Sequence, residues 1–173
     1  MIGAVAPKPD TAVLEIGGGA SCLVDGLLDR GYEDITVVDV SETALSKNRE
    51  RLGDHGAGIR FLQGNVLTLE LDRPVGVWHD RAVFHFLTAE EDRAAYLKTL
   101  RNTLRSGGHV VLATFALDGP EKCSGLPVQR YSPETLGQTL GDDHRLVRSL
   151  ARTHVTPQQK EQRFTYAAFQ REA

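Results

Sequence analysis

Residues 13–21 read Val-Leu-Glu-Ile-Gly-Gly-Gly-Ala-Ser, an apolar run that ends in an acid and three consecutive glycines. A helical pattern follows at once. Glycines have no Cβ, so the chain can turn tightly there and a ligand can lie against bare backbone. The N-terminus of the following helix offers free N–H groups. This stretch therefore predicts a strand that passes into a helix beneath a bound nucleotide-like ligand.

The composition predicts a single domain over residues 1–173, long enough to bury a substantial core. The formal net charge is −3 and no dense Lys/Arg run occurs, which disfavours nucleic acid as a partner. Cys22 and Cys123 match no zinc or redox spacing. No apolar run approaches the ~20 residues of a membrane span, and residues 1–8 are unlike a signal peptide. We expect a cytoplasmic protein without membrane contact.

Strand and helix patterns alternate along the chain, which predicts an α/β fold with a doubly wound, mostly parallel sheet. Two final strands with no helix between them should pair as an antiparallel hairpin. Thr88 and Glu91 have the spacing of a capping box at the start of a long helix. The expected strands are 11–16, 35–39, 59–63, 75–79, 109–115, 144–155 and 163–171; the expected helices are 20–30, 41–52 and 88–105 and one from 132; a turn is expected at 107–108 and an irregular loop at 118–131.

Five motifs occur in an order that resembles the class I S-adenosylmethionine-dependent methyltransferases. Glu15 to Gly19 matches the acid-x-Gly-x-Gly motif of that family, and Asp39 is the acid at the end of the second strand. Asn65 follows the third strand. Residues 83–87 are similar to the family's Val-Leu-His-His-Leu stretch, and residues 104–108 to its Leu-Lys-Pro-Gly-Gly corner. The resemblance implies a Rossmann-like, seven-stranded sheet and the cofactor S-adenosyl-L-methionine, with S-adenosyl-L-homocysteine as product.

The resemblance also implies roles for individual residues. Asp39 can accept hydrogen bonds from both ribose hydroxyls, and Glu15 suits the positive charges of the methionine end. Asn65 can bind the adenine edge, with Val66 against the ring face. The implied cofactor-binding set is Glu15, Gly17, Gly18, Gly19, Asp39, Val40, Asn65, Val66 and Asp80, of which Asp80 faces the methionine end or the acceptor.

NAD is the competing ligand, because Gly17 and Gly19 also begin a dinucleotide motif. The third glycine of that motif would fall at Cys22, which is bulkier than close packing of helix and strand requires. The methyl donor is therefore the favoured interpretation.

Methyl transfer needs alignment and exclusion of water, and a general base only where the acceptor must lose a proton. His79, Asp80 and His85 are the candidate bases, with Asp80 and His85 as the predicted catalytic residues. A half-buried structural role is the competing interpretation of His85. The same three side chains could be imagined as metal ligands, but no further acidic cluster accompanies them, so no metal is predicted.

The loop at 118–131 is the best candidate for acceptor recognition, since Arg130 can hold an acidic group and Tyr131 can supply a ring or hydroxyl. Solvated and packing roles are equally compatible with these two residues. Residues 79–82 lack the Asn-Pro-Pro-Tyr motif of enzymes that methylate exocyclic base nitrogens. A small-molecule acceptor is therefore predicted. The alternatives are a protein lysine methyltransferase and a non-catalytic module that binds the cofactor or its product.

Family members usually carry one or two helices before the first strand, and these close over the donor. Only residues 1–10 precede the first strand here. We therefore expect N-terminal lid helices that are short or missing, and a homodimer in which another subunit covers the site is one way to close it.

Overall fold

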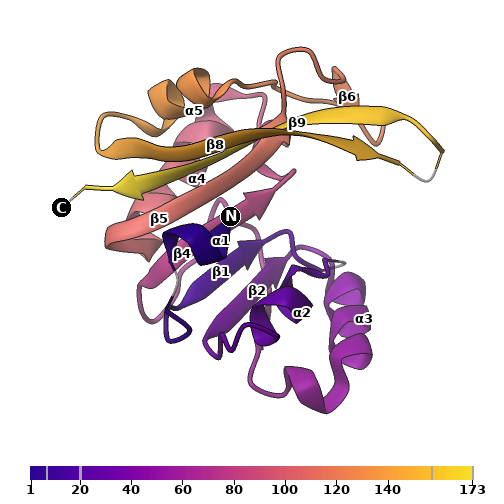
Figure 1. Ribbon diagram of the computed structural model, residues 1–173, viewed down its shortest axis with the longest axis vertical. Helices are drawn as coiled ribbons and strands as arrows, with labels where there is room; N and C mark the ends of the chain where they lie inside the picture. The colour runs from indigo at the N-terminus through magenta and orange to yellow at the C-terminus, as the bar shows by residue number, and fades with distance from the viewer. Residues whose placement is uncertain (7, 20, 157, 173) are drawn as a thin grey trace.

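The protein is described by a computed structural model covering residues 1–6, 8–19, 21–156 and 158–172. Its centre is a seven-stranded sheet with the strand order β3-β2-β1-β4-β5-β9-β8 (Figure 1). All neighbours from β3 to β5 pair in parallel, whereas β9 is antiparallel to both β5 and β8. The strands are β1 (Val13–Ile16), β2 (Ile35–Asp39), β3 (Arg60–Gln63), β4 (Val75–Arg81), β5 (Leu104–Phe115), β8 (His144–Val155) and β9 (Glu161–Arg171). The predicted fold class and the antiparallel C-terminal hairpin are confirmed.

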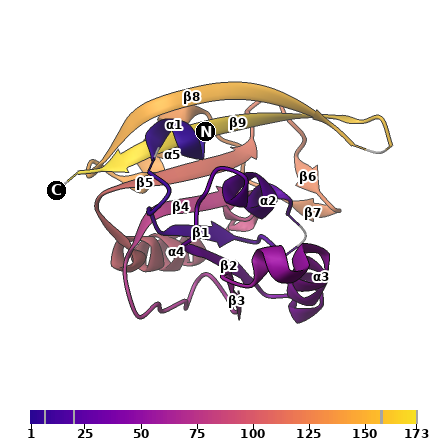
Figure 2. The same ribbon diagram turned by 60° about the horizontal axis from the view of Figure 1, so that its bottom comes forward.

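Helices cover both faces of the sheet (Figure 2). The strands alternate in the direction of their side chains, so Leu14 and Trp78 pack toward α4 and α5 while Val13 and Val77 pack toward α1, α2 and α3. Burial on both faces explains why these strands read as nearly continuous apolar runs. The helices are α1 (Ile2–Val5), α2 (Leu23–Leu28), α3 (Glu42–Leu52), α4 (Glu90–Thr103) and α5 (Pro133–Leu140), with 3₁₀ turns η1 (Gly53–Gly56) and η2 (Phe84–Phe86).

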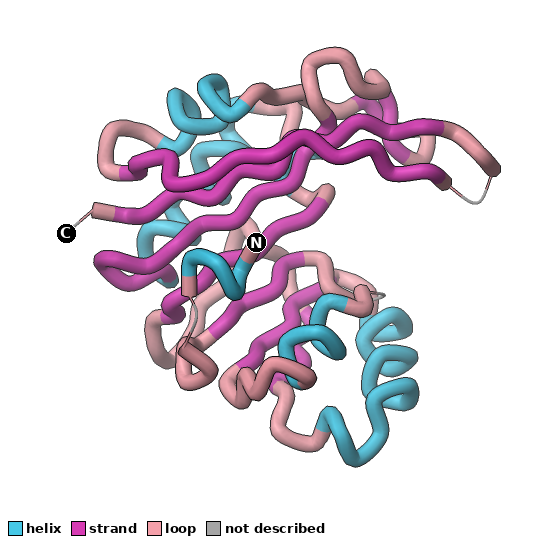
Figure 3. Tube along the Cα trace, in the orientation of Figure 1, coloured by secondary structure: helices cyan, strands magenta, loops and turns pink. Residues whose placement is uncertain are grey.

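The covering is uneven on the face that carries α2 and α3. On that face, the short α1 is the one helix among the described residues that packs with β5 and β9 (Figure 3). The opposite face of the same strands packs against α4 and α5. One half of the sheet thus keeps an open surface beside α2. No helix in the described ranges is long and apolar enough to cross a membrane.

Two helix starts follow the sequence and one does not. The Ser41 hydroxyl accepts a hydrogen bond from Ala44 N at the start of α3, and Ser132 forms a reciprocal capping box at the start of α5. The predicted capping box at Thr88 is wrong, because α4 begins one residue later and its N-cap is Ala89 without a side-chain hydrogen bond.

Other element boundaries also differ from the prediction. The second helix begins at Leu23 rather than at residue 20, which lies outside the described residues. Strand β4 continues to Arg81, two residues further than expected. The pair Gly107-Gly108 lies within β5, where the register against β4 shifts, and not in a turn before it. The 118–131 loop contains a small hairpin formed by β6 (Lys122–Cys123) and β7 (Leu126–Pro127).

Candidate active site

The glycine corner is packed so closely that side chains do not fit. Gly17 has a φ of +68°, and a Cβ there would lie 2.3 Å from Val83 Cγ2. A Cβ on Gly18 would lie 2.6 Å from the carboxyl carbon of Glu15. The backbone N–H of Gly17 donates to the carbonyl of Val38 at 2.8 Å, which ties the corner to β2. The glycines are therefore required by backbone conformation and by close approach.

A cavity of about 380 Å³ opens beside this corner, at the carboxyl ends of β1, β2 and β3. The wall opposite the strands is apolar and comes from Val83, Phe86 and Leu87, whose part in the site the sequence did not reveal. Its lining includes five of the predicted cofactor-binding residues: Gly17, Asp39, Val40, Asn65 and Val66. We call it the donor cavity.

Asp39 is held in position by the backbone around it. Its Oδ2 accepts a hydrogen bond from Gly19 N at 3.0 Å, and its Oδ1 accepts one from Ser41 N at 2.8 Å. The buried Asn48 on α3 donates from Nδ2 to the carbonyl of Gly18 at 3.0 Å. Asn48 was not anticipated, and a single amide on the buried side of a helix was its only signal. Together these bonds fix the glycine loop against β2 and α3.

Asn65 closes an Asx turn, since its Oδ1 accepts from Leu67 N at 3.0 Å. Its amide nitrogen has no partner within the described chain and is free to donate to a ligand. Val66 is buried beside it, whereas Val40 at the rim is 69% exposed. The cavity thus offers a polar edge with apolar walls, as an adenine ring requires.

Glu15 is buried next to the glycines, and its Oε2 has no hydrogen-bond partner within the described residues. Burial raises the pKa of this carboxyl to about 7, opposed by a hydrogen bond with Ser21 and assisted by the charges of Asp25 and Asp39. A buried acid without a counter-ion is a site for a cation. The residues present therefore fit a ligand that carries an ammonium group near the glycine corner.

Asp80 does not occupy the position expected of it. It is fully buried and lines neither the donor cavity nor the larger groove described below. Its Oδ1 accepts from Val83 N at 2.9 Å, and its Oδ2 accepts from Phe84 N at 3.1 Å and from the Tyr96 hydroxyl at 2.7 Å. Burial raises its pKa to about 6, and these three hydrogen bonds oppose the shift. Asp80 holds the start of η2 instead of facing a ligand.

His85 is likewise enclosed. Its Nδ1 accepts a long hydrogen bond from Phe115 N at 3.3 Å, and its ring packs edge-on to Phe86 at 4.7 Å between centroids. Burial lowers the pKa of the imidazole to about 4, so it is neutral near pH 7. The residue lines neither cavity, and the geometry favours its structural interpretation over base catalysis.

The two predicted acceptor residues are also engaged elsewhere. Arg130 donates to the carbonyl of Gly119 at 3.1 Å and to Glu121 at 3.3 Å. Tyr131 is buried with its ring 5.4 Å from that of Phe84, and its hydroxyl has no partner in the part of the chain that is described. Neither residue lines the donor cavity or the larger groove, so this geometry gives no support to acceptor binding by the 118–131 loop.

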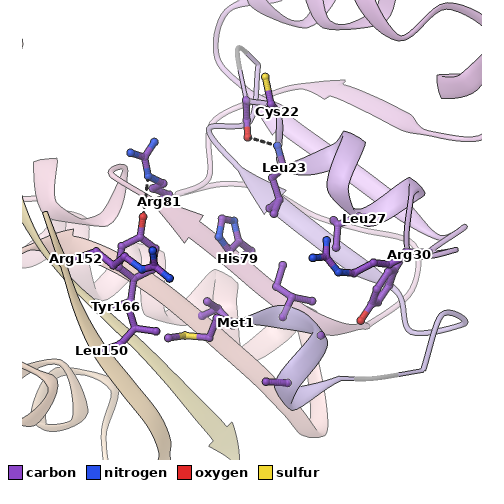
Figure 4. A pocket seen from close by; sticks show the side chains of 16 residues that line it. Met1, Cys22, Leu23, Leu27, Arg30, His79, Arg81, Leu150, Arg152 and Tyr166 are labelled. Atoms are coloured by element: carbon purple, nitrogen blue, oxygen red, sulfur yellow. Dashed lines mark hydrogen bonds between the residues drawn. The ribbon is translucent and has the colours of Figure 1, made fainter. Parts of the chain in front are cut away.

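A larger cavity of about 1070 Å³ lies on the open half of the sheet, between α1, α2 and the β8–β9 hairpin. Figure 4 shows His79 on its floor, with Arg81, Arg152 and Tyr166 on one side and Arg30 on the other. The sequence identified His79 only as one of three candidate bases. The described residues contain no group of three or more His, Cys, Asp or Glu side chains arranged to hold a metal ion.

Two curated proteins share part of this sequence. The mouse eEF1A lysine and N-terminal methyltransferase is 31% identical over 105 residues, which are 60% of this chain and 15% of that protein. The tRNA U34 carboxymethyltransferase of Actinobacillus succinogenes is 27% identical over 135 residues, 74% of this chain and 40% of that protein. This chain thus spans less than half the length of either curated relative.

A solved structure shares the fold at low sequence identity. The 1,6-didemethyltoxoflavin-N1-methyltransferase of Burkholderia thailandensis, with bound 1,6-didemethyltoxoflavin and S-adenosylhomocysteine, superposes with a TM-score of 0.77 at 19% identity, covering 99% of this chain and 75% of that one. Residues 13–108, more than half of the chain, match the family described as "Methyltransferase domain". The chain therefore belongs to the class I S-adenosylmethionine-dependent methyltransferases.

Proposed function

We propose that the protein transfers a methyl group from S-adenosylmethionine to a small molecule in the cytoplasm. The observation that carries the proposal is a cavity beside the glycine corner whose rim holds Asp39 and Asn65. The buried, unpartnered carboxylate of Glu15 lies behind that corner, against Gly18, and is not itself part of the cavity lining. Glu15 would hold the ammonium of the donor, Asp39 the ribose hydroxyls and Asn65 the adenine edge. These contacts lie at the carboxyl ends of neighbouring parallel strands, where such folds bind ligands.

The cofactor supplies an activated methyl group, whose bond to sulfur breaks as a bond to the acceptor forms, leaving neutral S-adenosylhomocysteine. The chain's own part is to bind and orient both partners and to exclude water. Val83, Phe86 and Leu87 form the apolar wall of the donor cavity. Neither Asp80 nor His85 reaches this cavity, so we assign neither a proton transfer.

Protein methylation is the second candidate, supported by the name of the mouse relative, which modifies lysine and the N-terminus of eEF1A. A small-molecule acceptor is supported by the name of the Burkholderia enzyme, whose fold covers almost the whole chain. Calorimetry with S-adenosylhomocysteine, S-adenosylmethionine and NAD tests the donor assignment. We expect both sulfur compounds to bind and NAD not to bind; tight NAD binding without a response to either sulfur compound would refute it.

Donor affinity should depend on pH through Glu15. In the free protein the pKa of the Glu15 carboxyl is raised above its ordinary value to about 7. Below that pH the carboxyl is mostly protonated, and it must lose its proton before it can pair with an ammonium group. Affinity for S-adenosylhomocysteine should therefore rise with pH up to about 7, by at most about tenfold per unit, and then level off. Calorimetry between pH 5.5 and 8 measures this dependence. Glu15→Gln should bind more weakly with a flat profile, and an unchanged profile in that variant would rule out Glu15 as the ammonium partner.

Asp39→Ala should weaken S-adenosylhomocysteine binding by about 1.5–3 kcal/mol, because two charge-assisted hydrogen bonds to the ribose are lost. That loss is roughly 10- to 150-fold in Kd. The matched control is Ser41→Ala, which removes the cap of α3 but leaves the carboxylate in place. The control should lower stability by about 1 kcal/mol and leave affinity nearly unchanged. Equal losses in both variants would mean that Asp39 acts only through the order of α3.

A further inference from the structure

The larger groove concentrates positive charge. Arg30 follows α2, Arg81 ends β4 and Arg152 lies on β8, and all three line the cavity. No Asp or Glu is among its lining residues, although the chain as a whole has a net charge of −3. Within the described parts of the chain, none of the three arginines forms an ion pair within 4.0 Å. Cations grouped in a concave site without counter-ions favour an anionic ligand.

Arg81 is held ready for such a ligand by neutral groups. Its Nε donates to the Tyr166 hydroxyl at 3.1 Å (Figure 4). Its guanidinium lies over the ring of Phe164 at 5.2 Å from the centroid. These contacts orient the planar fork and do not neutralise its charge. The two terminal nitrogens have no partner among the described residues and can bind a carboxylate or phosphate in bidentate geometry.

His79 supplies a second and independent indication of a ligand. It is only 7% exposed and it lines the groove, and its Nδ1 is itself enclosed and has no hydrogen-bond partner among the described residues. Burial and nearby positive charges, that of Arg81 among them, lower its pKa to about 4, so the ring is a neutral hydrogen-bonding group. A buried polar side chain without partners is costly unless a ligand satisfies it.

The groove begins next to the donor corner. His79 on β4 lies directly opposite Glu15 on β1 in the parallel register, so their side chains share one face of the sheet. Ser21 and Cys22, which follow the glycines, line the same groove. A molecule that fills it therefore extends from His79, the cross-strand neighbour of Glu15, toward the arginines of β4 and β8.

We propose that this groove receives the methyl acceptor, and that the acceptor is a small molecule with a carboxylate or phosphate group bound by Arg81 and Arg152. The inference rests on the proposed methyl transfer. The nucleophilic atom of the acceptor lies at the His79 end, where the imidazole binds and orients it, and the acid group lies at the far end. The three arginines repel a cationic lysine, which separates this acceptor class from protein lysine methylation.

The first experiment tests the anion site in protein saturated with S-adenosylhomocysteine. Inorganic phosphate and, separately, acetate are titrated at constant ionic strength while the Nε–Hε signals of the arginine side chains are followed by NMR. We expect the signals of Arg81 and Arg152 to shift in a saturable manner. In an R81Q/R152Q double variant, the affinity for phosphate should be at least about tenfold lower than in the unmodified protein. Arg145→Gln, at the exposed other end of β8, is the matched control and should change nothing. Shifts no larger than those of Arg145 would overturn the proposal.

The second experiment tests the acceptor class. A labelled methyl donor is supplied with a pool of amino and hydroxy acids, a pool of their amides, and lysine peptides. We expect the label to appear in one or more of the acids. For an acid that accepts the label, the KM should rise at least about tenfold in R81Q/R152Q while kcat changes less. Label in amides or peptides, or an unchanged KM, overturns the proposal. If no pool is labelled and S-adenosylhomocysteine does not bind, methyl transfer itself is refuted. If no pool is labelled although S-adenosylhomocysteine binds, the proposed acceptor class is overturned.

Discussion

Gly17→Ala should reduce S-adenosylhomocysteine binding by about 100-fold or more and lower stability by roughly 2–5 kcal/mol. Two costs add at this position. An alanine at a φ of +68° is strained by about 1–2 kcal/mol, and its Cβ would lie 2.3 Å from Val83 Cγ2. Relieving such overpacking costs a further ~1–3 kcal/mol. Because Val83 forms a wall of the donor cavity, its displacement should also change the shape of the cavity and weaken donor binding. Calorimetry and thermal unfolding measure the two effects.

Gly107→Ala is the matched control for this prediction. Gly107 has nearly the same φ, +71°, but a Cβ there would meet nothing within 4 Å. It should therefore show the conformational strain alone, about 1–2 kcal/mol, with normal donor binding. If Gly17→Ala behaves like Gly107→Ala in both measurements, the close approach at the glycine corner has no role in binding.

Tyr96→Phe should lower the free energy of unfolding by about 2–4 kcal/mol. The Tyr96 hydroxyl accepts from Trp78 Nε1 at 2.8 Å and donates to Asp80 Oδ2 at 2.7 Å, all three groups being buried. Its removal leaves the indole N–H unsatisfied, at ~1–3 kcal/mol, and takes one donor from a buried carboxylate. At roughly 2–4 °C per kcal/mol for a chain of this size, the melting temperature should fall by about 4–16 °C.

Tyr131→Phe provides the comparison, since its hydroxyl is buried and has no partner within the described residues. Its loss should be neutral or slightly stabilising. The two variants should also differ in pH dependence. The raised pKa of Asp80, about 6, means that the folded state holds its proton more tightly than the unfolded state, so stability falls as pH rises from about 4 to 6. Tyr96→Phe should extend that fall to higher pH, and equal losses in both variants would refute the network.

The sequence was sufficient for the architecture because its signals there are local. Parallel strands buried on both faces appear as apolar runs, and the acid or amide that ends each run, such as Asp39 or Asn65, comes to lie at the ligand edge of the sheet. The hairpin at the C-terminus followed from the absence of a helix between its strands. These features depend on neighbours in the chain, which a sequence displays.

The side chains assigned to chemistry were not predictable in the same way. Strand β4 runs two residues further than its apolar pattern, so Asp80 points to the α4 side, where Tyr96 covers it. Tyr96 is 16 residues away from Asp80 in the sequence, and no local sequence pattern predicts their hydrogen bond. The arginines of the groove come from the turn after α2, from β4 and from β8, and they meet only when the sheet is assembled. Long-range convergence of this kind requires the structure.

The position of β9 between β5 and β8 has a consequence for synthesis of the chain on the ribosome. The strands up to β5 can pair as they emerge, but β5 is apolar and presents an open edge until the last strand has been made. At about 5–20 residues per second this interval lasts seconds, long compared with strand association. An unpaired apolar edge is a template for aggregation, so the nascent protein is most vulnerable just before its C-terminal segment is released. Mutations that weaken the β5–β9 pairing should therefore reduce yield more than their effect on the finished fold suggests.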